Sequence, residues 1–433
     1  MLAGMQDTQA ALLLPALFFL VLTTDRRSVT MAAMSSWARY LGCRGLSELS
    51  YQVAAVAVGW QIYALTHSAF DLGLAGLVQF IPTLLLVFGA GHAADRFDRR
   101  GIVRSCQLAA GLAAALLAWG SFAGWLTVSE LFCAVAIFGS AAAFESPASA
   151  ALLPSVVPAS GLQRGTALST AVFQLANISG PAMGGVACAV APGVPYALMA
   201  GFWLTGALLI WGVRLSSDSA QAKGASSREP PALSSLFAGV GFVRRNPAIL
   251  GTISLDLFAV LLGGAAALLP IYARDILHTG AWGLGILRAT PAVGALAMTA
   301  VLARYTIQNR AGMRMFSAVI IFGGATVVFA VSHSLWLSIL ALAIMGAADT
   351  VSMVIRISLV QLATPDEMRG RVGAVNFLFI NASSQLGEFE SGMTAAWFGA
   401  VPAAVLGGLG TIVVALLWMK LFPTLRDVES LEP

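Results

Sequence analysis

Three features of the sequence predict an all-α integral membrane protein. Of its 433 residues, 58% are apolar and only 10% are charged, whereas soluble proteins carry about 25% charged residues. The mean hydropathy is +0.84. Apolar stretches recur along the whole chain, each near the roughly 20 residues that a helix needs to cross about 30 Å of hydrocarbon. The composition therefore excludes a soluble globular protein.

Twelve transmembrane helices are predicted. Their connections are mostly short, so neighbouring helices are expected to run antiparallel. The predicted spans are 41–65, 72–94, 102–122, 127–152, 166–190, 195–213, 248–273, 281–304, 312–331, 335–361, 372–396 and 400–420.

The basic residues predict the orientation of the chain. When residues at the span ends are counted with the adjoining loops, 20 of the 24 Lys and Arg residues fall on one side of the predicted spans, Arg274 alone falls on the other, and three lie within spans. Basic residues concentrate in short cytoplasmic loops. We therefore expect both termini to be cytoplasmic.

The spans divide the chain into two six-helix bundles. The expected domains are an N-terminal cytoplasmic extension (1–40), an N-terminal bundle (41–213), a cytoplasmic linker with a surface helix (214–247), a C-terminal bundle (248–420) and a cytoplasmic tail (421–433).

The N-terminal extension and the linker each contain a further sequence pattern. Residues 10–22 are apolar but too few to cross a bilayer. Residues 1–30 are therefore expected to form a disordered extension, with a surface-lying helix or a signal-like segment as the alternatives. Residues 214–231 are rich in Ser, Ala and Pro, as in a flexible linker. Residues 233–245 then place apolar side chains at helical spacing and end in two arginines, which is typical of a membrane-surface helix.

The two halves resemble each other when the chain is shifted against itself by 207 residues. PASGLQRGTALSTAVFQLANISGPAMGG, from Pro158, then falls on PDEMRGRVGAVNFLFINASSQLGEFESG, from Pro365, without a gap, and Gly185 meets Gly392. Both segments begin in the loop between the fourth and fifth spans of their half. Parallel repeats with a substrate site at their interface are a transporter architecture.

The loop between the second and third spans carries a specific motif. GHAADRFDRR, from Gly91 to Arg100, resembles the Gly-x-x-x-Asp-Arg-x-x-Arg-Arg loop of the major facilitator superfamily, with Asp98 in place of the usual Gly. The resemblance extends over nearly the whole chain from Arg39. ALTHSAFDLGLAGLVQFIP, FESPASAALLPSVVP and QLATPDEMRGRVGAV are similar to its drug and siderophore efflux branch, which includes macrolide exporters. The resemblance implies two pseudo-symmetric six-helix bundles.

A second motif of this superfamily lies in the fifth span. ISGPAMGG matches the Gly-Pro-x-x-Gly-Gly part of the pattern that marks antiporters, through Gly180, Pro181, Gly184 and Gly185. Small residues allow close helix approach, and a proline allows a kink. The fourth span lacks the Arg that many proton antiporters of the superfamily carry.

Apart from residues at the span ends, nine ionisable residues lie within the predicted spans, where each costs about 2.5 to 3.5 kcal/mol to insert near the bilayer centre. Glu48, Glu145, Asp256 and Asp349 fall on the first, fourth, seventh and tenth predicted spans. The resemblance implies that these four spans line the central cavity. Arg356 lies two turns from Asp349 on the same helix face. These five are the predicted proton-coupling and cavity residues. The other four are Arg44, Arg288, Glu388 and Glu390.

The Gly91 to Arg100 loop is expected to gate the transporter. Asp95 would sit near the N-terminus of the eleventh span, where a carboxylate is stabilised by about 0.3 to 1 kcal/mol, and would hold the outward-open state. The alternative is that Arg96, Arg99 and Arg100 only set topology and bind anionic lipid headgroups.

These patterns predict a secondary active transporter that exports an amphipathic small molecule (a drug, siderophore or secondary metabolite) by alternating access and proton exchange. The alternatives are a superfamily importer or uniporter of a small solute and, more remotely, a membrane-embedded enzyme. No convergent set of catalytic groups supports the enzyme, and no Gly-x-x-x-x-Gly-Lys-Ser/Thr phosphate loop supports a nucleotide-driven pump.

The expected partners are a small-molecule substrate, protons and membrane lipid, without nucleic acid. No cofactor and no metal site are predicted, because four scattered histidines and four cysteines inside apolar stretches form no ligand cluster. A monomer in the bacterial cytoplasmic (inner) membrane is expected.

Overall fold

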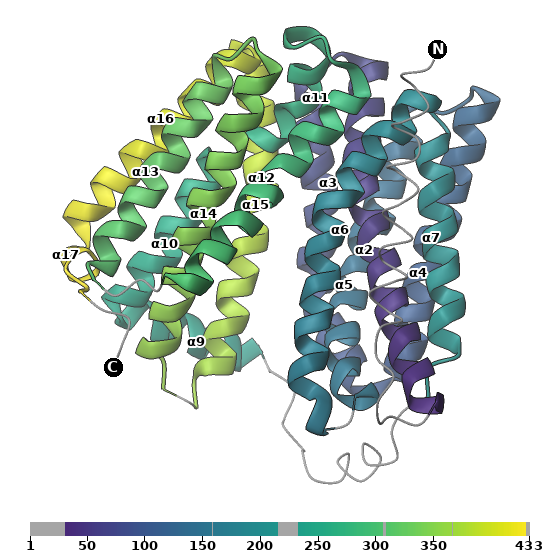
Figure 1. Cartoon of the computed structure of the whole chain (residues 1–433), viewed down its shortest axis with the longest axis horizontal. Coiled ribbons are helices and arrows are strands. Elements are labelled where there is room, and N and C mark those ends of the chain that lie inside the picture. Colours follow the sequence, from purple (N-terminus) through teal and green to yellow (C-terminus); the bar gives the residue numbers. More distant parts are fainter. Residues whose placement is uncertain (1–30, 158, 215–232, 306–308, 366, 430–433) are drawn as a thin grey trace.

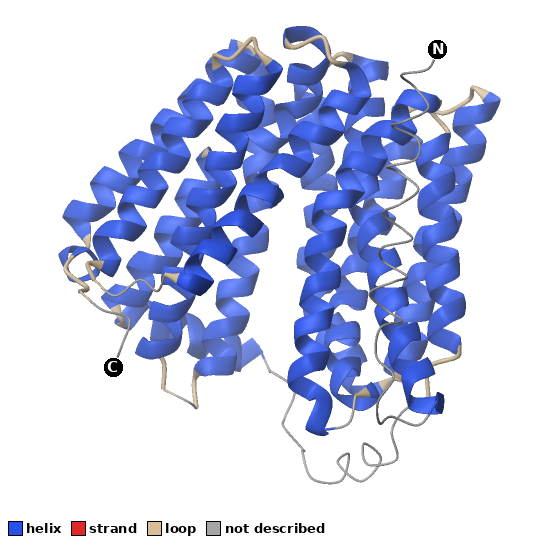
Figure 2. Cartoon of the chain, in the orientation of Figure 1, coloured by secondary structure: helices blue, strands red, loops and turns tan. Residues whose placement is uncertain are grey.

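The computed structural model describes residues 31–157, 159–214, 233–305, 309–365 and 367–429, and these ranges contain helices and no strand (Figure 2). The expectations for residues 1–30 and for most of the linker lie outside the described residues. The described chain forms two helical bundles side by side, one from each half of the sequence (Figure 1). The predicted fold class is confirmed.

The N-terminal half contains six long helices. They are α2 (Met31–Thr66), α3 (Ala69–Arg96), α4 (Arg99–Ala123), α5 (Val128–Val156), α6 (Leu162–Val190) and α7 (Val194–Trp211), with the short 3-10 helix η1 (Ala159–Gly161) before α6.

The C-terminal half repeats this arrangement. Its elements are α10 (Pro247–Leu262), η2 (Ala265–Leu268), α11 (Leu269–Ile271), η3 (Tyr272–Ile276), α12 (Gly280–Arg304), α13 (Ala311–Ala330), α14 (Leu335–Ala363), α15 (Arg369–Phe398) and α16 (Ala400–Leu421), followed by the short α17 (Pro423–Arg426).

Nine helical segments among the described residues are long and apolar enough to cross a membrane by length and composition alone. The remaining three long helices, α2, α6 and α15, have 36, 29 and 30 residues, so length does not set them apart. They carry amide and charged side chains in their middle turns, such as Gln52, Asn177 and Gln385. Their polar content is what sets these three helices apart from the other nine.

The predicted seventh span, 248–273, falls within the apolar helical segment Pro247–Ile276. It is not one uninterrupted α-helix, because α10 ends at Leu262 and is followed by Gly263 and Gly264, a 3-10 turn, one α-helical turn and the π-helical stretch η3. Two adjacent glycines permit the break, since glycine lacks the Cβ that favours a continuous helix.

Residues 233–245 do form a helix, α9 (Leu233–Arg245). Val243 is 5% exposed and packs with Ile249, Val372 and Val375 in one apolar cluster. The described part of the apolar face of α9 is therefore covered by α10 and α15. The C-terminal bundle itself, rather than lipid alone, holds this helix in place.

The ends of the first long segment in each half are alike. His67 after α2 and His278 after η3 both have left-handed backbones, with φ of 52° and 50°. Each ring Nδ1 lies within hydrogen-bond distance of the carbonyl oxygen four residues earlier, at 2.8 and 3.1 Å. The two halves thus repeat an uncommon local geometry, which supports their common origin.

The two halves approach each other at one end of the molecule and separate toward the other (Figure 1). We call the first the closed end; it is the end at which α2 finishes and α3 begins. We call the second the open end; it carries the Gly91 to Arg100 loop. The contacts between the halves described below lie in the part of each helix nearest the closed end.

Candidate functional site

A cavity of about 280 Å³ lies between the two halves. The N-terminal half contributes α2, α3 and α5 to its lining, and the C-terminal half contributes η2, α11, α12 and α15. Most of its lining residues are small or apolar, but polar groups make up about as much of its exposed surface as apolar groups do. The polar lining residues are Tyr51, Gln52, Gln79, Arg288, Gln385 and Glu388.

Arg288 and Glu388 form an ion pair in the wall of this cavity. One Arg288 nitrogen lies 3.8 Å from Oε1 of Glu388, and the side chains are 23% and 29% exposed. The Oε1 atom of Gln385, one turn from Glu388, is buried without a hydrogen-bond partner among the described residues. The cavity therefore presents both a positive and a negative group, together with an acceptor that a bound molecule can satisfy.

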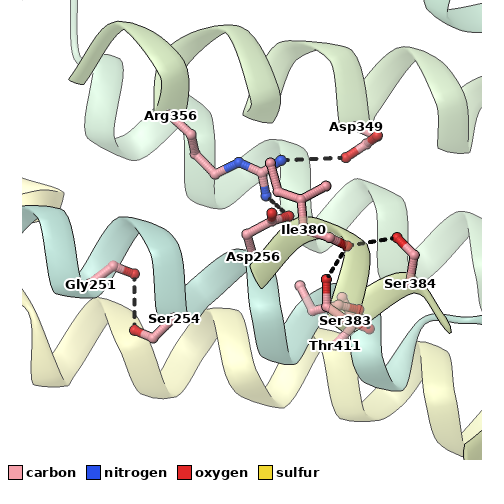
Figure 3. A network of polar contacts seen from close by, with 10 residues as sticks. Gly251, Ser254, Asp256, Asp349, Arg356, Ile380, Ser383, Ser384 and Thr411 are labelled. Atoms are coloured by element: carbon pink, nitrogen blue, oxygen red, sulfur yellow. Dashed lines mark hydrogen bonds and ion pairs between the residues drawn. The ribbon is translucent and has the colours of Figure 1, made fainter. Parts of the chain in front are cut away.

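A second charged cluster lies inside the C-terminal half (Figure 3). Arg356 on α14 donates from Nη1 to Asp256 on α10, and its Nη2 lies 3.9 Å from Oδ1 of Asp349 on α14. The side chain of Asp256 is 7% exposed, whereas that of Asp349 is 48% exposed. One guanidinium is thus shared between a buried carboxylate and an accessible one.

Glu145 lies in the interior of the N-terminal half. This residue of α5 is 6% exposed and accepts hydrogen bonds from Nε2 of Gln107, at 2.8 Å, and from the hydroxyl of Tyr51, at 3.3 Å. Gln107 belongs to α4 and Tyr51 to α2, so Glu145 joins three helices of one half. Tyr51 in turn lines the interface cavity, and it connects Glu145 to that cavity.

Glu48 takes part in a chain of amides rather than in an ion pair. Its Oε1 accepts from Nε2 of Gln52, one turn later on α2, at 3.1 Å. The same Gln52 nitrogen donates to Oδ1 of Asn177 on α6. Glu48 is therefore linked through Gln52 to the lining of the interface cavity.

The loop predicted to act as a gate ties helices of its own half together. Arg99 donates to the carbonyl oxygens of Ala94 and Ala151 at 3.2 and 2.8 Å, and Arg100 donates to that of Val213 at 3.2 Å. Cations are favourable beside the carbonyl groups at helix C-termini. These arginines thus fasten the ends of α3, α5 and α7.

Three further residues of this loop have defined positions. Asp98, where the superfamily motif has Gly, is the N-cap of α4 and accepts from the backbone N–H of Arg100 at 3.3 Å. Arg96 is exposed, and Gly91 has open space where a Cβ would be. Asp95 belongs to α3, but its side chain is outside the described part of the structure.

The glycines of the second motif pack against two different helices. A Cβ added to Gly180 would clash with Cβ of Gln52, and one added to Gly184 would lie 3.1 Å from Cβ of Val56, both on α2. Gly185 instead meets α12 of the other half, where an added Cβ would lie 2.8 Å from the Cα of Gly285.

The carbonyl oxygen of Pro181 completes this crossing. A Cβ added to Gly285 would lie 2.6 Å from it. On the other side of the molecule, α3 and α15 cross equally closely, since a Cβ added to Gly392 would lie 2.5 Å from the Cα of Gly73. Gly185 and Gly392 are the residues that coincide when the sequence is shifted by 207 residues. The two crossings are therefore related by the internal repeat.

The structure brings some of the predicted residues together and leaves others apart. Asp256, Asp349 and Arg356 form one cluster, whereas Glu48 and Glu145 belong to separate networks of the N-terminal half. Sequence reasoning did not select Arg288 or Glu388 as cavity residues. Their presence as charged residues within spans was the one sequence feature that could have indicated a role in the cavity. Their positions, 100 residues apart along the chain, did not indicate that they form an ion pair.

The chain was compared with known proteins. Residues 37–433 match the family model described as "Transmembrane secretion effector". The enterobactin exporter EntS of Citrobacter koseri is 26% identical over 393 residues, which cover 90% of this chain and 92% of that exporter. The multidrug efflux pump Tap of Mycobacterium tuberculosis is 27% identical over 396 residues, which cover 87% of this chain and 91% of the pump.

Solved structures share the fold. A bacterial homolog of the human lysosomal transporter Spinster, in an inward-facing and unoccupied conformation, superposes with a TM-score of 0.71 at 12% identity, covering 92% of this chain and 97% of the homolog. A bacterial homologue of the iron transporter ferroportin, in an inward-facing state, gives a TM-score of 0.67 at 18% identity, covering 90% and 99%.

Proposed function

We propose that this chain, which belongs to the transmembrane secretion effector family of the major facilitator superfamily, exports an amphipathic small molecule in exchange for protons. It does so as a secondary transporter of this family. The similarity to an enterobactin exporter and to a multidrug efflux pump, each over about nine tenths of the chain, supports export of a drug, siderophore or secondary metabolite.

The observation that carries this proposal is the interface cavity. Both halves line it, so its lining must change when the halves move relative to each other, as alternating access requires. Its volume of about 280 Å³ is close to the lower bound of small-molecule sites, about 300 Å³. The substrate would contact both apolar walls and polar groups, the Arg288–Glu388 pair among them.

The distribution of basic residues supports an orientation. In the proposed arrangement the open end, both termini and the 214–247 linker face the cytoplasm, and the closed end faces outward across the inner membrane. The open end carries the arginines of the Gly91 to Arg100 loop, whereas Arg274 is the one basic residue that the span prediction assigns to the closed end. The structure then corresponds to an inward-facing state of a monomer.

Proton coupling is proposed to involve Glu48, Asp256 and Asp349, with Glu145 next. Two carboxylates share the single guanidinium of Arg356, so the cluster with both carboxylates ionised carries one net negative charge and can accept one proton. Asp349 is the member through which a proton would enter, because its side chain is about half exposed while Asp256 is buried.

Efflux assays test this function. A deletion strain screened against a compound panel identifies an exported substrate by hypersensitivity, and everted membrane vesicles then measure its uptake with an imposed pH gradient. The native chain is expected to concentrate the substrate only when the vesicle interior is acidic. Substrate movement in the opposite direction, or accumulation that a protonophore leaves unchanged, would exclude proton-driven export.

Single replacements separate the candidate carboxylates. The variants to be tested are Glu48→Gln, Asp256→Asn and Asp349→Asn. The replacement that removes the coupling carboxylate is expected to abolish uphill efflux while substrate binding persists. Asp71→Asn, in the first turn of α3 and away from these networks, is the matched control. If all three neutral variants still pump against a gradient, the coupling site is elsewhere and Glu145 is tested next.

A further inference from the structure

Residues 265–276, between the glycine pair and the end of η3, occupy a distinctive position, and we call them the lid. They comprise η2, α11 and η3. Ala266, Ala267 and Pro270 of the lid line the interface cavity. Pro270 also lies against α2, since a Cβ added to Gly59 would be 3.4 Å from its Cγ. The lid therefore covers the cavity on the side of the closed end.

The outer part of the lid is fastened to the opposite half. The hydroxyl of Tyr63, on α2, donates a hydrogen bond to Oδ2 of Asp275. This bond joins the N-terminal bundle to the C-terminal bundle at the closed end. The bond is charge-assisted, and hydrogen bonds of that kind are about twice as strong as neutral ones.

Arg274 adds a second attachment at the same place. Its Cζ lies 6.0 Å from the ring centroid of Trp60 and 5.9 Å from that of Tyr63, both within the range of cation–π attraction. The positive-inside pattern leaves this arginine as an exception at the closed end. At this position Arg274 holds the lid against two aromatic rings of the other half.

The inner part of the lid is fastened to its own half. The hydroxyl of Tyr272 donates to the carbonyl oxygen of Ala330 at 2.9 Å, and its ring lies 4.5 Å from that of Phe329 on α13. The lid is thus joined to α13 through buried contacts and to α2 through contacts at its outer edge. When the halves separate at the closed end, the contacts with α2 are those that must break.

From these contacts we propose that residues 265–276 are the outer lid of the substrate cavity, and that Tyr63, Asp275, Arg274 and Trp60 form the latch that keeps it shut. Opening releases the latch, while Tyr272 keeps the lid on α13. This proposal rests on the alternating-access function proposed above and identifies the residues that control access to the cavity from outside.

Cysteine labelling tests the latch without any substrate. In a chain whose four native cysteines are replaced by Ala, Ala267→Cys places a thiol in the lid beside the cavity, where Ala267 is 8% exposed. A membrane-impermeant maleimide is applied to whole cells and, separately, to everted vesicles. Tyr63→Phe removes only the hydroxyl and keeps the ring beneath Arg274.

Tyr63→Phe is expected to raise the rate of labelling from outside about tenfold, the effect of losing one hydrogen bond to a charged group. Tyr196→Phe is the matched control, because its hydroxyl bonds to the carbonyl oxygen of Ala57 within the N-terminal half, at 3.4 Å. Its labelling should stay within about twofold of the parent, since no contact between the halves is lost.

The outcomes separate the lid from the transport function. Unchanged labelling in Tyr63→Phe, or an equal rise in Tyr196→Phe, overturns the latch. A rise in Tyr63→Phe without export of any tested compound supports the lid and counts against the proposed function. A rise seen only in everted vesicles supports the lid and reverses the proposed orientation. Should Tyr63→Phe fail to fold, Asp275→Asn tests the same bond.

Discussion

Replacing Gly185 by Ala should open the closed end of the molecule. The added Cβ would lie 2.7 Å from the carbonyl oxygen of Ala281, whereas ordinary contacts begin at 3.4 Å, so α6 and α12 must separate there by about 0.7 Å. Introducing such a clash into a packed interface typically costs about 1 to 3 kcal/mol. The gain in helix propensity, about 1 kcal/mol, is the same in every conformation in which α6 is helical, and it does not offset this cost.

The closed-end contact should therefore weaken by at least about 1 kcal/mol, which changes the ratio of two conformations about fivefold. Spin labels at Ala123→Cys and His333→Cys, both exposed near the closed end and in different halves, report the separation by pulsed electron paramagnetic resonance. The longer-distance population is expected to grow in Gly185→Ala.

Gly201→Ala is the control for this measurement, since no heavy atom lies within 4 Å of its added Cβ. A distance distribution in Gly185→Ala that matches the parent would refute the argument that this crossing holds the closed end together. An identical change in Gly201→Ala would show that any added methyl group on a helix has the same effect.

Three further predictions concern topology, gating and stability. Reporter fusions at Pro433 and within the 214–247 linker should be active only in the cytoplasm, and a periplasmic signal at either would contradict the twelve-span orientation. Asp95→Asn should raise labelling of cavity cysteines from the cytoplasmic side about fivefold, for a loss of about 1 kcal/mol, and should slow transport; if both stay unchanged, the loop only sets topology. Arg356→Gln should lower the free energy of unfolding in detergent by about 3 kcal/mol or more, because it leaves the buried carboxylate of Asp256 unpaired. Arg288→Gln is the comparison, since the side chain of Arg288 is more exposed. An equal loss in Arg288→Gln would show that burial does not determine the cost.

The transmembrane pattern could be predicted because it depends on local composition. Each predicted span overlaps a long helical segment, and the polar character of α2, α6 and α15 is already present in their residues. The 3.9 Å contact between Asp349 and Arg356 also follows from spacing, because the two lie two turns apart on one helix face. The Gly263–Gly264 pair was the available sign that the seventh span breaks.

Contacts between distant helices could not be predicted in this way. Asp256 and Arg356 are 100 residues apart, and their pairing depends on how α10 and α14 are placed by the rest of the bundle. Tyr63 and Asp275 lie in different halves, so their bond also depends on the conformation of the transporter. Helical periodicity identifies the face on which a residue lies but not its partner across an interface.

The repeat-related crossings at Gly185–Gly285 and Gly73–Gly392 have a consequence for how the protein is made. During synthesis the N-terminal bundle enters the membrane first, with the small-residue faces of α3 and α6 not yet covered. The face of α6 can be covered once α12 is inserted, but that of α3 must wait for α15, near the end of the chain. Assembly of the transporter is thus completed only when almost the whole chain has been translated, and until then α3 presents a glycine surface to which other membrane helices can bind.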